Sequence, residues 1–166
     1  MREHPRLRTG AHEGVILFSV SGQKFAIAAG AVNEIRSCEE LREFNLGTVT
    51  ERLEKLRYTL ERNGTTYFVV DGGLHFQLRA SIRGRVLILR NSTAAVLVDS
   101  TDRMVDIFAL HALPRAFTGQ ERIWYRGLAV IAGEVVPVVN PAAFLSKAEQ
   151  EIVRSGLERL QGVGSL

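Results

Sequence analysis

The chain repeats itself, and this internal repeat constrains the fold more than any other feature. Residues 15–35 contain an apolar run, a polar turn and a second apolar run that ends in an apolar-acidic-isoleucine pattern, and residues 86–107 have the same order. The two closing isoleucines lie 72 residues apart. Downstream, residues 60–76 match residues 130–145 at an offset of 69. Two similar offsets in the same order predict two copies of one β-rich unit.

Residues typical of tight turns occur at corresponding positions in both copies. Four dipeptides lie between runs rich in Val, Ile, Phe or Tyr, namely Ser21-Gly22, Asn63-Gly64, Asn91-Ser92 and Ala132-Gly133. Gly and Asn tolerate the positive φ of tight hairpin loops, so we predict four β-hairpins. The strands are too continuously apolar for one face to be open to water. Small closed barrels packed together meet this requirement, because closure removes exposed sheet edges.

Helical signals occur in two places. Val49, Leu53 and Leu56 recur at helical spacing and predict a short amphipathic helix over residues 49–56. Near the carboxyl end, Asn140 is placed to cap a turn, and Ser146 with Glu149 has capping-box spacing. We therefore predict a carboxyl-terminal helix over about 141–161, which either covers one barrel or serves as a docking face for a partner.

Composition places the chain among ordinary folded domains. Its 166 residues are 46% hydrophobic and 23% charged, which suits a single domain over 14–166 behind a flexible basic arm, 1–13. The single cysteine, Cys38, excludes a disulfide-stapled or Cys-rich zinc domain and favours a reducing cytoplasm. The longest apolar stretch, 127–139, is interrupted by Glu134 and is too short for direct membrane insertion.

The charge balance argues against nucleic acid as the main partner. There are 21 basic and 18 acidic residues, a net charge of +3, and most arginines have an acidic neighbour within a few positions. A nucleic-acid footprint shows as clustering on one face or in one run. A small β-barrel that binds nucleic acid through its arginines remains the alternative function, and a steep loss of affinity with added salt would favour it.

The polar residues show no arrangement typical of a catalytic or metal site. No histidine has a second ligand at helix or hairpin spacing, and no glycine-rich loop has the context of a phosphate cradle, so we predict no metal and no cofactor. Asp71 and Asp99 both end apolar strands. They could serve a hydrolase if they lay within about 10 Å of each other in a pocket. Asp71 corresponds to Asn140 in the repeat, and both residue types accept backbone hydrogen bonds at turns, so we favour a structural role and predict no enzyme.

Several segments taken together resemble the CheW-like domain of bacterial chemotaxis adaptors. They are the Ala-Val-x-Glu-Ile at 31–35, the strand ending in Val-Val-Asp at 69–71, the Val-Leu-Val-Asp at 96–99, and the Gly-Glu-Val-Val-Pro-Val-Val-Asn at 133–140 followed by a helix. The similarity covers residues 14–145. It implies an all-β fold of two SH3-like five-stranded barrels with a few short helices and no catalytic activity. It also implies an adaptor that couples the cytoplasmic tip of a chemoreceptor to the regulatory domain of a CheA-like histidine kinase.

The resemblance also implies partner-binding residues. In the family, receptor contacts fall near the end of the second strand and around a middle Asn-Leu-Arg-Gly motif. Carried over by position, they become Val32, Glu34, Ile35, Arg36, Arg62 and Gly64. The middle motif departs from the family pattern, because one extra residue separates Arg62 from Gly64, and the Pro and Arg that flank the family's Val-Val-Asp are absent.

Strand periodicity predicts how the first of these residues are oriented. Phe25 and Ile27 alternate as core-facing residues do. If Ile35 also faces inward, then Val32, Glu34 and Arg36 share the outward face. One apolar residue beside two opposite charges would suit a protein interface.

Overall fold

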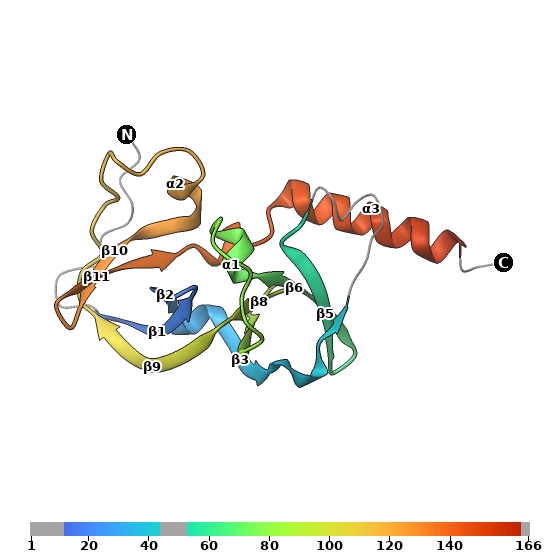
Figure 1. The fold of residues 1–166 in the computed structure, drawn as a ribbon, viewed down its shortest axis with the longest axis horizontal. Helices are drawn as coiled ribbons and strands as arrows, with labels where there is room; N and C mark the ends of the chain where they lie inside the picture. The colour runs from blue at the N-terminus through green and yellow to red at the C-terminus, as the bar shows by residue number, and fades with distance from the viewer. Residues whose placement is uncertain (1–11, 44–52, 164–166) are drawn as a thin grey trace.

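The computed structural model describes residues 12–43 and 53–163. Within them the chain forms two sheets, and Figure 1 shows them side by side with a long helix over one of them. Sheet A contains β1 (Glu13–Val20), β2 (Gln23–Ala28), β9 (Ser100–Ile107), β10 (Tyr125–Ile131) and β11 (Glu134–Val139). Sheet B contains β3 (Val32–Ser37), β4 (Arg42–Glu43), β5 (Leu56–Arg62), β6 (Thr65–Asp71), β7 (Arg85–Leu89) and β8 (Ala94–Val98).

The helices are short except for the last. The three-residue 3-10 turns are η1 (Ala29–Ala31), η2 (Cys38–Glu40) and η4 (Pro141–Ala143), and the α-helices are α1 (Gly72–His75), α2 (Glu121–Trp124) and α3 (Lys147–Val163). The predicted all-β architecture with a carboxyl-terminal helix is therefore confirmed. Residues 1–11 of the predicted arm lie outside the described part of the chain, and β1 begins at Glu13.

The repeat has a topological meaning that the sequence alone did not show. Sheet A has the order β10-β11-β2-β1-β9, and sheet B contains β5-β6-β8-β7-β3 in the equivalent order, with β4 added at the edge. The pairings β11 with β2 and β6 with β8 are both parallel. Each sheet therefore combines the first hairpin of one copy with the remaining strands of the other. The two copies exchange hairpins, so neither can complete its sheet alone.

The sheets are strongly curved but are not closed barrels, contrary to the predicted closure. In sheet A, the ladder ends at β9 and β10, and in sheet B it ends at β3 and β4. The open edge of β10 is partly covered, because His111 and Leu128 exchange two backbone hydrogen bonds of 2.8 Å. In sheet B, side chains of the edge strand β3 contact β5, next to the other edge, as described below.

Three apolar cores explain why the strands are apolar on both faces. Val15 and Leu17 face a core inside sheet A, whereas their neighbours Phe18 and Val20 face a larger core shared by both sheets. A third core lies inside sheet B and includes Leu60, Val86 and Leu97. Because residues that alternate along a strand enter different cores, both faces must be apolar. The predicted covering of both sheet faces is confirmed.

All four predicted hairpin turns are present. Ser21, Asn63, Asn91 and Ala132 have φ between 51° and 55°. The glycines that follow three of them have φ from 77° to 79°, a backbone conformation that costs a residue with a side chain more than it costs glycine.

The predicted helix over 49–56 is wrong where it can be checked. Residues 49–52 lie outside the described part of the chain, Glu54 and Lys55 form a turn, and Leu56 begins β5.

Helix α3 starts later than predicted but uses the predicted caps. Asn140 Oδ1 accepts a hydrogen bond of 3.2 Å from the Ala142 amide at the start of η4. The Ser146 amide donates to Glu149 Oε1 at 2.9 Å, and the Glu149 amide donates to Ser146 Oγ at 3.2 Å, which is a reciprocal capping box. Val153 of α3 is buried in the shared core, and Ile152 and Leu157 pack against it. The helix therefore covers part of the core above sheet B (Figure 1).

Candidate functional site

The predicted partner-binding strand is β3, at one edge of sheet B. It is not a continuation of β2, because η1 carries the chain from sheet A to sheet B at Ala29–Ala31. The pairing of β3 with β7 slips at Asn33. Val32 lies opposite Leu89, and Glu34 lies opposite the next residue of β7, Ile88. Asn33 is therefore an extra residue of β3 that has no opposite residue in β7. This β-bulge interrupts the alternation of side chains.

The bulge overturns part of the predicted orientation. Val32 was expected to face outward but is only 7% exposed and belongs to the shared core. Ile35 was expected to face inward but is 41% exposed. Glu34 and Arg36 are both partly exposed, as expected for an outward face. Val32 therefore belongs to the interior, and Ile35 is the exposed apolar residue of β3. Ile35 lies opposite Leu87 of the shared core, whereas Glu34 and Arg36 lie opposite residues of the core inside sheet B, so Ile35 is on the other face of the strand from the two charges.

Arg62 joins Glu34 and Arg36, although 28 residues separate Arg62 from Glu34. Arg62 Nε donates to Glu34 Oε2, and Arg62 Nη2 donates to Glu34 Oε1, both at 3.2 Å. Arg36 Nη1 donates to Glu34 Oε1 at 3.0 Å. These bonds connect β3 to β5 across the open side of sheet B. We call Glu34, Arg36, Arg62 and the adjacent Glu40 the Glu34 cluster.

Glu40 is the member of this cluster that the sequence analysis missed. Arg36 Nη2 donates to Glu40 Oε1 at 2.5 Å, so the guanidinium of Arg36 bridges two carboxylates. The only sequence signal was the four-residue spacing of Arg36 and Glu40. That spacing predicts a contact on a helix, but here it spans the end of β3 and the short turn η2.

The charges of the Glu34 cluster support one another. Hydrogen bonds first from Arg62 and then from Arg36 lower the pKa of Glu34 below its ordinary value of 4.5. Hydrogen bonds to Glu34 and then Glu40 raise the pKa of Arg36 above its ordinary value. Glu34 and Arg36 are therefore ionised near neutral pH, and the hydrogen bonds of the cluster hold its side chains in place. Such an array provides orientation and specificity to a protein contact.

Gly64, the last of the predicted binding residues, lies in the exposed turn after β5. Its φ is +79°, and a Cβ built at this position would meet no atom within 4 Å. The residue is therefore required by the turn and leaves the surface beside Arg62 uncrowded. The extra residue in the middle motif, Asn63, takes the first positive-φ position of this turn.

Asp71 and Asp99 have structural rather than catalytic surroundings. Asp71 is fully buried, and its carboxylate accepts hydrogen bonds from the Leu74 amide at 3.1 Å and the Ser81 amide at 2.9 Å. Asp99 accepts from the Ser21 amide at 2.8 Å and the Ile82 amide at 2.9 Å. Both carboxylates are occupied by backbone donors, which supports the structural interpretation of the sequence pattern.

His75 is a buried structural residue held among aromatic rings. It is 5% exposed, and its ring centroid lies 4.8 Å from that of Phe76, 5.6 Å from that of Trp124 and 4.7 Å from that of Phe144. Its Nδ1 lies 3.2 Å from Lys55 Nζ, and Lys55 also donates to Glu149 of α3 at 3.0 Å. Burial first, and then the charge of Lys55, lower the pKa of His75 from 6.5 to about 3. The ring is therefore neutral under ordinary conditions.

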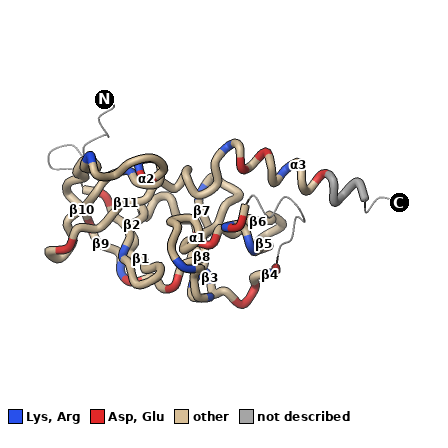
Figure 2. Tube along the Cα trace, turned by 45° about the horizontal axis from the view of Figure 1, so that its top comes forward, with Lys and Arg blue, Asp and Glu red and all other residues tan. Residues whose placement is uncertain are grey.

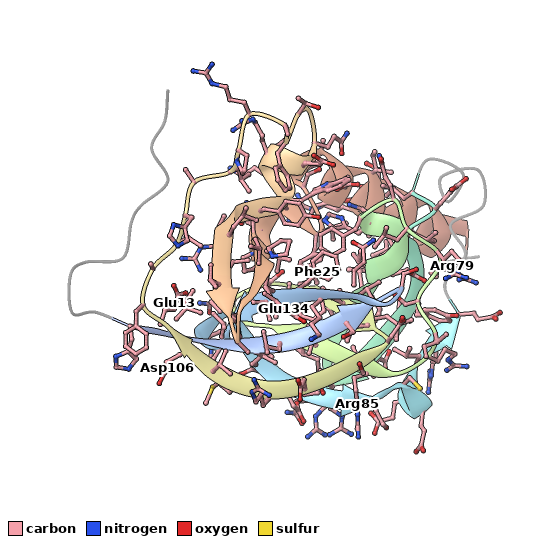
Figure 3. The ribbon with its side chains drawn as sticks, turned by 60° about the vertical axis from the view of Figure 1, so that its left-hand side comes forward. Glu13, Phe25, Arg79, Arg85, Asp106 and Glu134 are labelled. Carbon is pink, nitrogen blue, oxygen red and sulfur yellow. The ribbon has the colours of Figure 1, made fainter. Side chains whose placement is uncertain are left out.

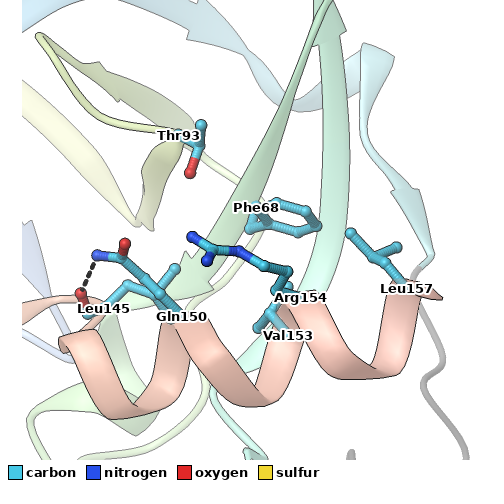
Figure 4. A pocket seen from close by; sticks show the side chains of 7 residues that line it. All are labelled: Phe68, Thr93, Leu145, Gln150, Val153, Arg154 and Leu157. Atoms are coloured by element: carbon cyan, nitrogen blue, oxygen red, sulfur yellow. Dashed lines mark hydrogen bonds between the residues drawn. The ribbon is translucent and has the colours of Figure 1, made fainter. Parts of the chain in front are cut away.

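One groove of about 210 Å³ lies between α3 and β6 (Figure 4). It is lined by Phe68, Thr93, Leu145, Gln150, Val153, Arg154 and Leu157. Its polar groups are partly engaged, because Gln150 Nε2 donates to the Leu145 carbonyl at 3.0 Å and Arg154 pairs with Glu151 at 3.1 Å. This lining contains no nucleophile next to a general base. In residues 12–43 and 53–163, no group of three or more His, Cys, Asp or Glu side chains is placed to hold a metal ion.

Charged residues of both signs are spread over the described part of the chain (Figure 2). Over the same part of the chain, no helix combines the length and the apolar character needed to cross a bilayer.

Comparison with known proteins identifies the family. The family model described as the CheW-like domain matches residues 14–149. The chain belongs to the CheW-like domain family. No curated protein sequence matches this chain significantly. Among solved structures, it is similar to the scaffolding protein TtCheW from Thermoanaerobacter tengcongensis, with 14% sequence identity and a TM-score of 0.70 over 90% of this chain and 94% of the other.

The CheW-like fold is thus retained although few residues are shared. At 14% identity the structural match supports the arrangement of strands and not any particular binding residue. The family assignment agrees with the two sheets, the exchanged hairpins and the helix α3.

Proposed function

We propose that this chain is a non-enzymatic cytoplasmic adaptor. It couples the cytoplasmic tip of a methyl-accepting chemoreceptor to the regulatory domain of a CheA-like histidine kinase. The observation that carries the proposal is the match of the CheW-like family model to residues 14–149. The engaged carboxylates of Asp71 and Asp99 are consistent with a role in binding rather than catalysis.

In this proposal, one docking site is the edge strand β3, with the Glu34 cluster on one face and Ile35 on the other. The exposed part of Ile35 supplies apolar contact area, and the paired charges fix the orientation of the partner. The cluster is already ordered by its internal hydrogen bonds, so binding does not have to immobilise four free side chains. Preorganisation of this kind favours affinity.

Substitution of Glu34 by Lys tests this site. The change places a third cation between Arg36 and Arg62, so we expect affinity for a receptor-tip fragment or for the kinase regulatory domain to fall by about tenfold or more. Because the lost ion pairs are partly exposed, the melting temperature should fall by no more than about 5 °C, and the protein should stay folded. Isothermal titration calorimetry with each partner measures the first effect, and thermal unfolding measures the second.

Two matched controls separate the site from general surface effects. Glu158→Lys makes the same change of charge at an exposed position of α3, and Ile123→Ser removes an isoleucine that is 61% exposed on α2. Ile35→Ser should weaken binding severalfold, whereas both controls should bind like the unmodified protein. If Glu34→Lys and Ile35→Ser leave both affinities unchanged, the Glu34 cluster is not a docking site.

A further inference from the structure

A basic surface lies next to the Glu34 cluster but contains none of its residues, because Arg85 lies opposite Ser37 of β3 and Arg83 contacts Cys38 of η2. No Asp or Glu occurs between Asp71 and Asp99, whereas four arginines do. Three of them lie on or next to the connection from α1 to β7, and all three are exposed, as is Ile82 at 68%. We call Arg79, Ile82, Arg83 and Arg85 the basic surface.

The backbone that carries the basic surface is held by buried polar contacts. Ser81 is 9% exposed, its amide donates to Asp71, and its Oγ donates to the Leu97 carbonyl at 3.1 Å. The next amide, that of Ile82, donates to Asp99 Oδ1 at 2.9 Å. The two aspartates that flank the acid-free stretch therefore direct their carboxylates to backbone amides of this connection.

Close packing fixes the same connection at both ends. A Cβ at Gly73 would lie 1.8 Å from the Arg79 carbonyl oxygen, and a Cβ at Gly84 would lie 1.9 Å from the Asp99 carbonyl oxygen. Only glycine permits such approach. The basic surface is thus presented by a backbone with little freedom to lose, which lowers the entropic cost of binding.

The positive charge of this surface is largely uncompensated. Arg79 and Arg85 form no ion pair with any residue of 12–43 or 53–163, and Figure 3 shows both side chains projecting away from the ribbon. Arg83 Nη2 donates to the Cys38 carbonyl at 3.0 Å, which leaves its charge unpaired. Arg57 also lies nearby, because Arg57 and Arg83 lie 5.6 and 5.5 Å from the centroid of the Tyr58 ring, but Arg57 pairs with Asp71 at 3.7 Å.

We propose that the basic surface docks an acidic protein segment that carries an apolar residue between its acidic side chains. Three arginines around an exposed isoleucine match such a segment in charge and in apolar contact. The surface does not suit single-stranded nucleic acid, because the aromatic ring beside it, Tyr58, is 9% exposed and offers no face for base stacking. This proposal stands independently of the adaptor function.

Fluorescence anisotropy of the full chain with a labelled peptide, Asp-Glu-Glu-Leu-Glu-Asp-Glu, tests the proposal. Replacing Arg79, Arg83 and Arg85 together by Glu should weaken binding by about tenfold or more, and Ile82→Ser should weaken it about threefold. The matched control replaces Arg103, Arg115 and Arg122 by Glu, an equal charge change at exposed positions outside the surface, and should change affinity less than about twofold. A peptide with Ser in place of Leu should bind more weakly to the unmodified chain.

The proposal is wrong if the peptide does not bind, or if the triple variant and its control lose equal affinity for it. It is also wrong if the Leu and Ser peptides bind with equal affinity. Tighter binding of a single-stranded oligonucleotide that Ile82→Ser does not affect would overturn it as well. Thermal unfolding checks that each variant is folded. If the triple variant is not folded, Arg79→Gln with Arg85→Gln replaces it and should still weaken binding severalfold.

Discussion

Replacing Phe25 by Ala should lower the free energy of unfolding by about 4 kcal/mol. Phe25 is 2% exposed and lies in the core that both sheets share. Its ring centroid lies 5.5 Å from that of Phe18, 4.5 Å from that of Phe76 and 6.3 Å from that of Tyr125, all in stacked arrangements. Figure 3 shows it in the middle of the molecule. Truncation removes the ring and leaves a cavity between two rings of sheet A, Phe18 and Tyr125, and Phe76, which follows α1.

Chemical denaturation of both proteins measures this loss. Phe108→Ala is the matched control, because Phe108 is 69% exposed, and it should cost less than about 0.5 kcal/mol. Since each sheet takes strands from both copies of the repeat, unfolding should occur in one transition. A cost below about 1 kcal/mol for Phe25→Ala, or two separate transitions in the unmodified protein, would contradict a shared core.

The second large effect is a loss of stability in acid that depends on His75. Its pKa is lowered from 6.5 to about 3 in the folded protein, so the unfolded chain binds a proton that the folded chain excludes. Stability from this group is present above pH 6.5 and is lost as the pH falls from 6.5 towards 3. The loss approaches about 1.4 kcal/mol per pH unit, which amounts to about 2 kcal/mol between pH 7 and pH 5.

The position of Lys55 explains which nitrogen of His75 carries the proton. An ammonium group only donates, so Nδ1 accepts from Lys55, and the proton is on Nε2. Nε2 is buried and has no hydrogen-bond partner in the described part of the chain. Protonation of Nδ1 would place a second positive charge beside Lys55 in a site that water does not reach.

His75→Phe should therefore flatten the pH dependence between pH 7 and pH 5. Phenylalanine fits among the surrounding rings, and Lys55 keeps its bond to Glu149. Denaturation midpoints at several pH values give the comparison, and His111→Gln, at an exposed position, controls for the removal of a histidine. An equal acid slope in the unmodified protein and His75→Phe would show that His75 does not contribute to it.

The hairpins and caps were predictable because their signals are local. Positive φ at Asn63 and Ala132 is followed by glycine in the next position, and the capping box of Ser146 and Glu149 involves neighbours in sequence. The exchange of hairpins between the sheets was not predictable in this way. The alternation of side chains shows that a strand has two covered faces but does not show which strand covers them.

The candidate site shows the same limit at the scale of single residues. One bulged residue, Asn33, buries Val32 and exposes Ile35, and nothing in the local pattern marks it. Arg62 and Glu34 were both proposed from the family resemblance, but their contact depends on the curvature of sheet B. The helix predicted over 49–56 failed at Leu56 because pairing with Val70 of β6 overrides its helical spacing.

Co-sedimentation with receptor-bearing vesicles tests the adaptor proposal most directly. A CheA-like kinase that lacks other adaptors should pellet with the vesicles only when this chain is added, and the chain should pellet with them. Glu34→Lys should reduce the pelleted kinase by about tenfold, whereas Glu158→Lys should not. If the folded chain leaves the kinase in the supernatant at concentrations well above those of both partners, it does not couple receptor to kinase.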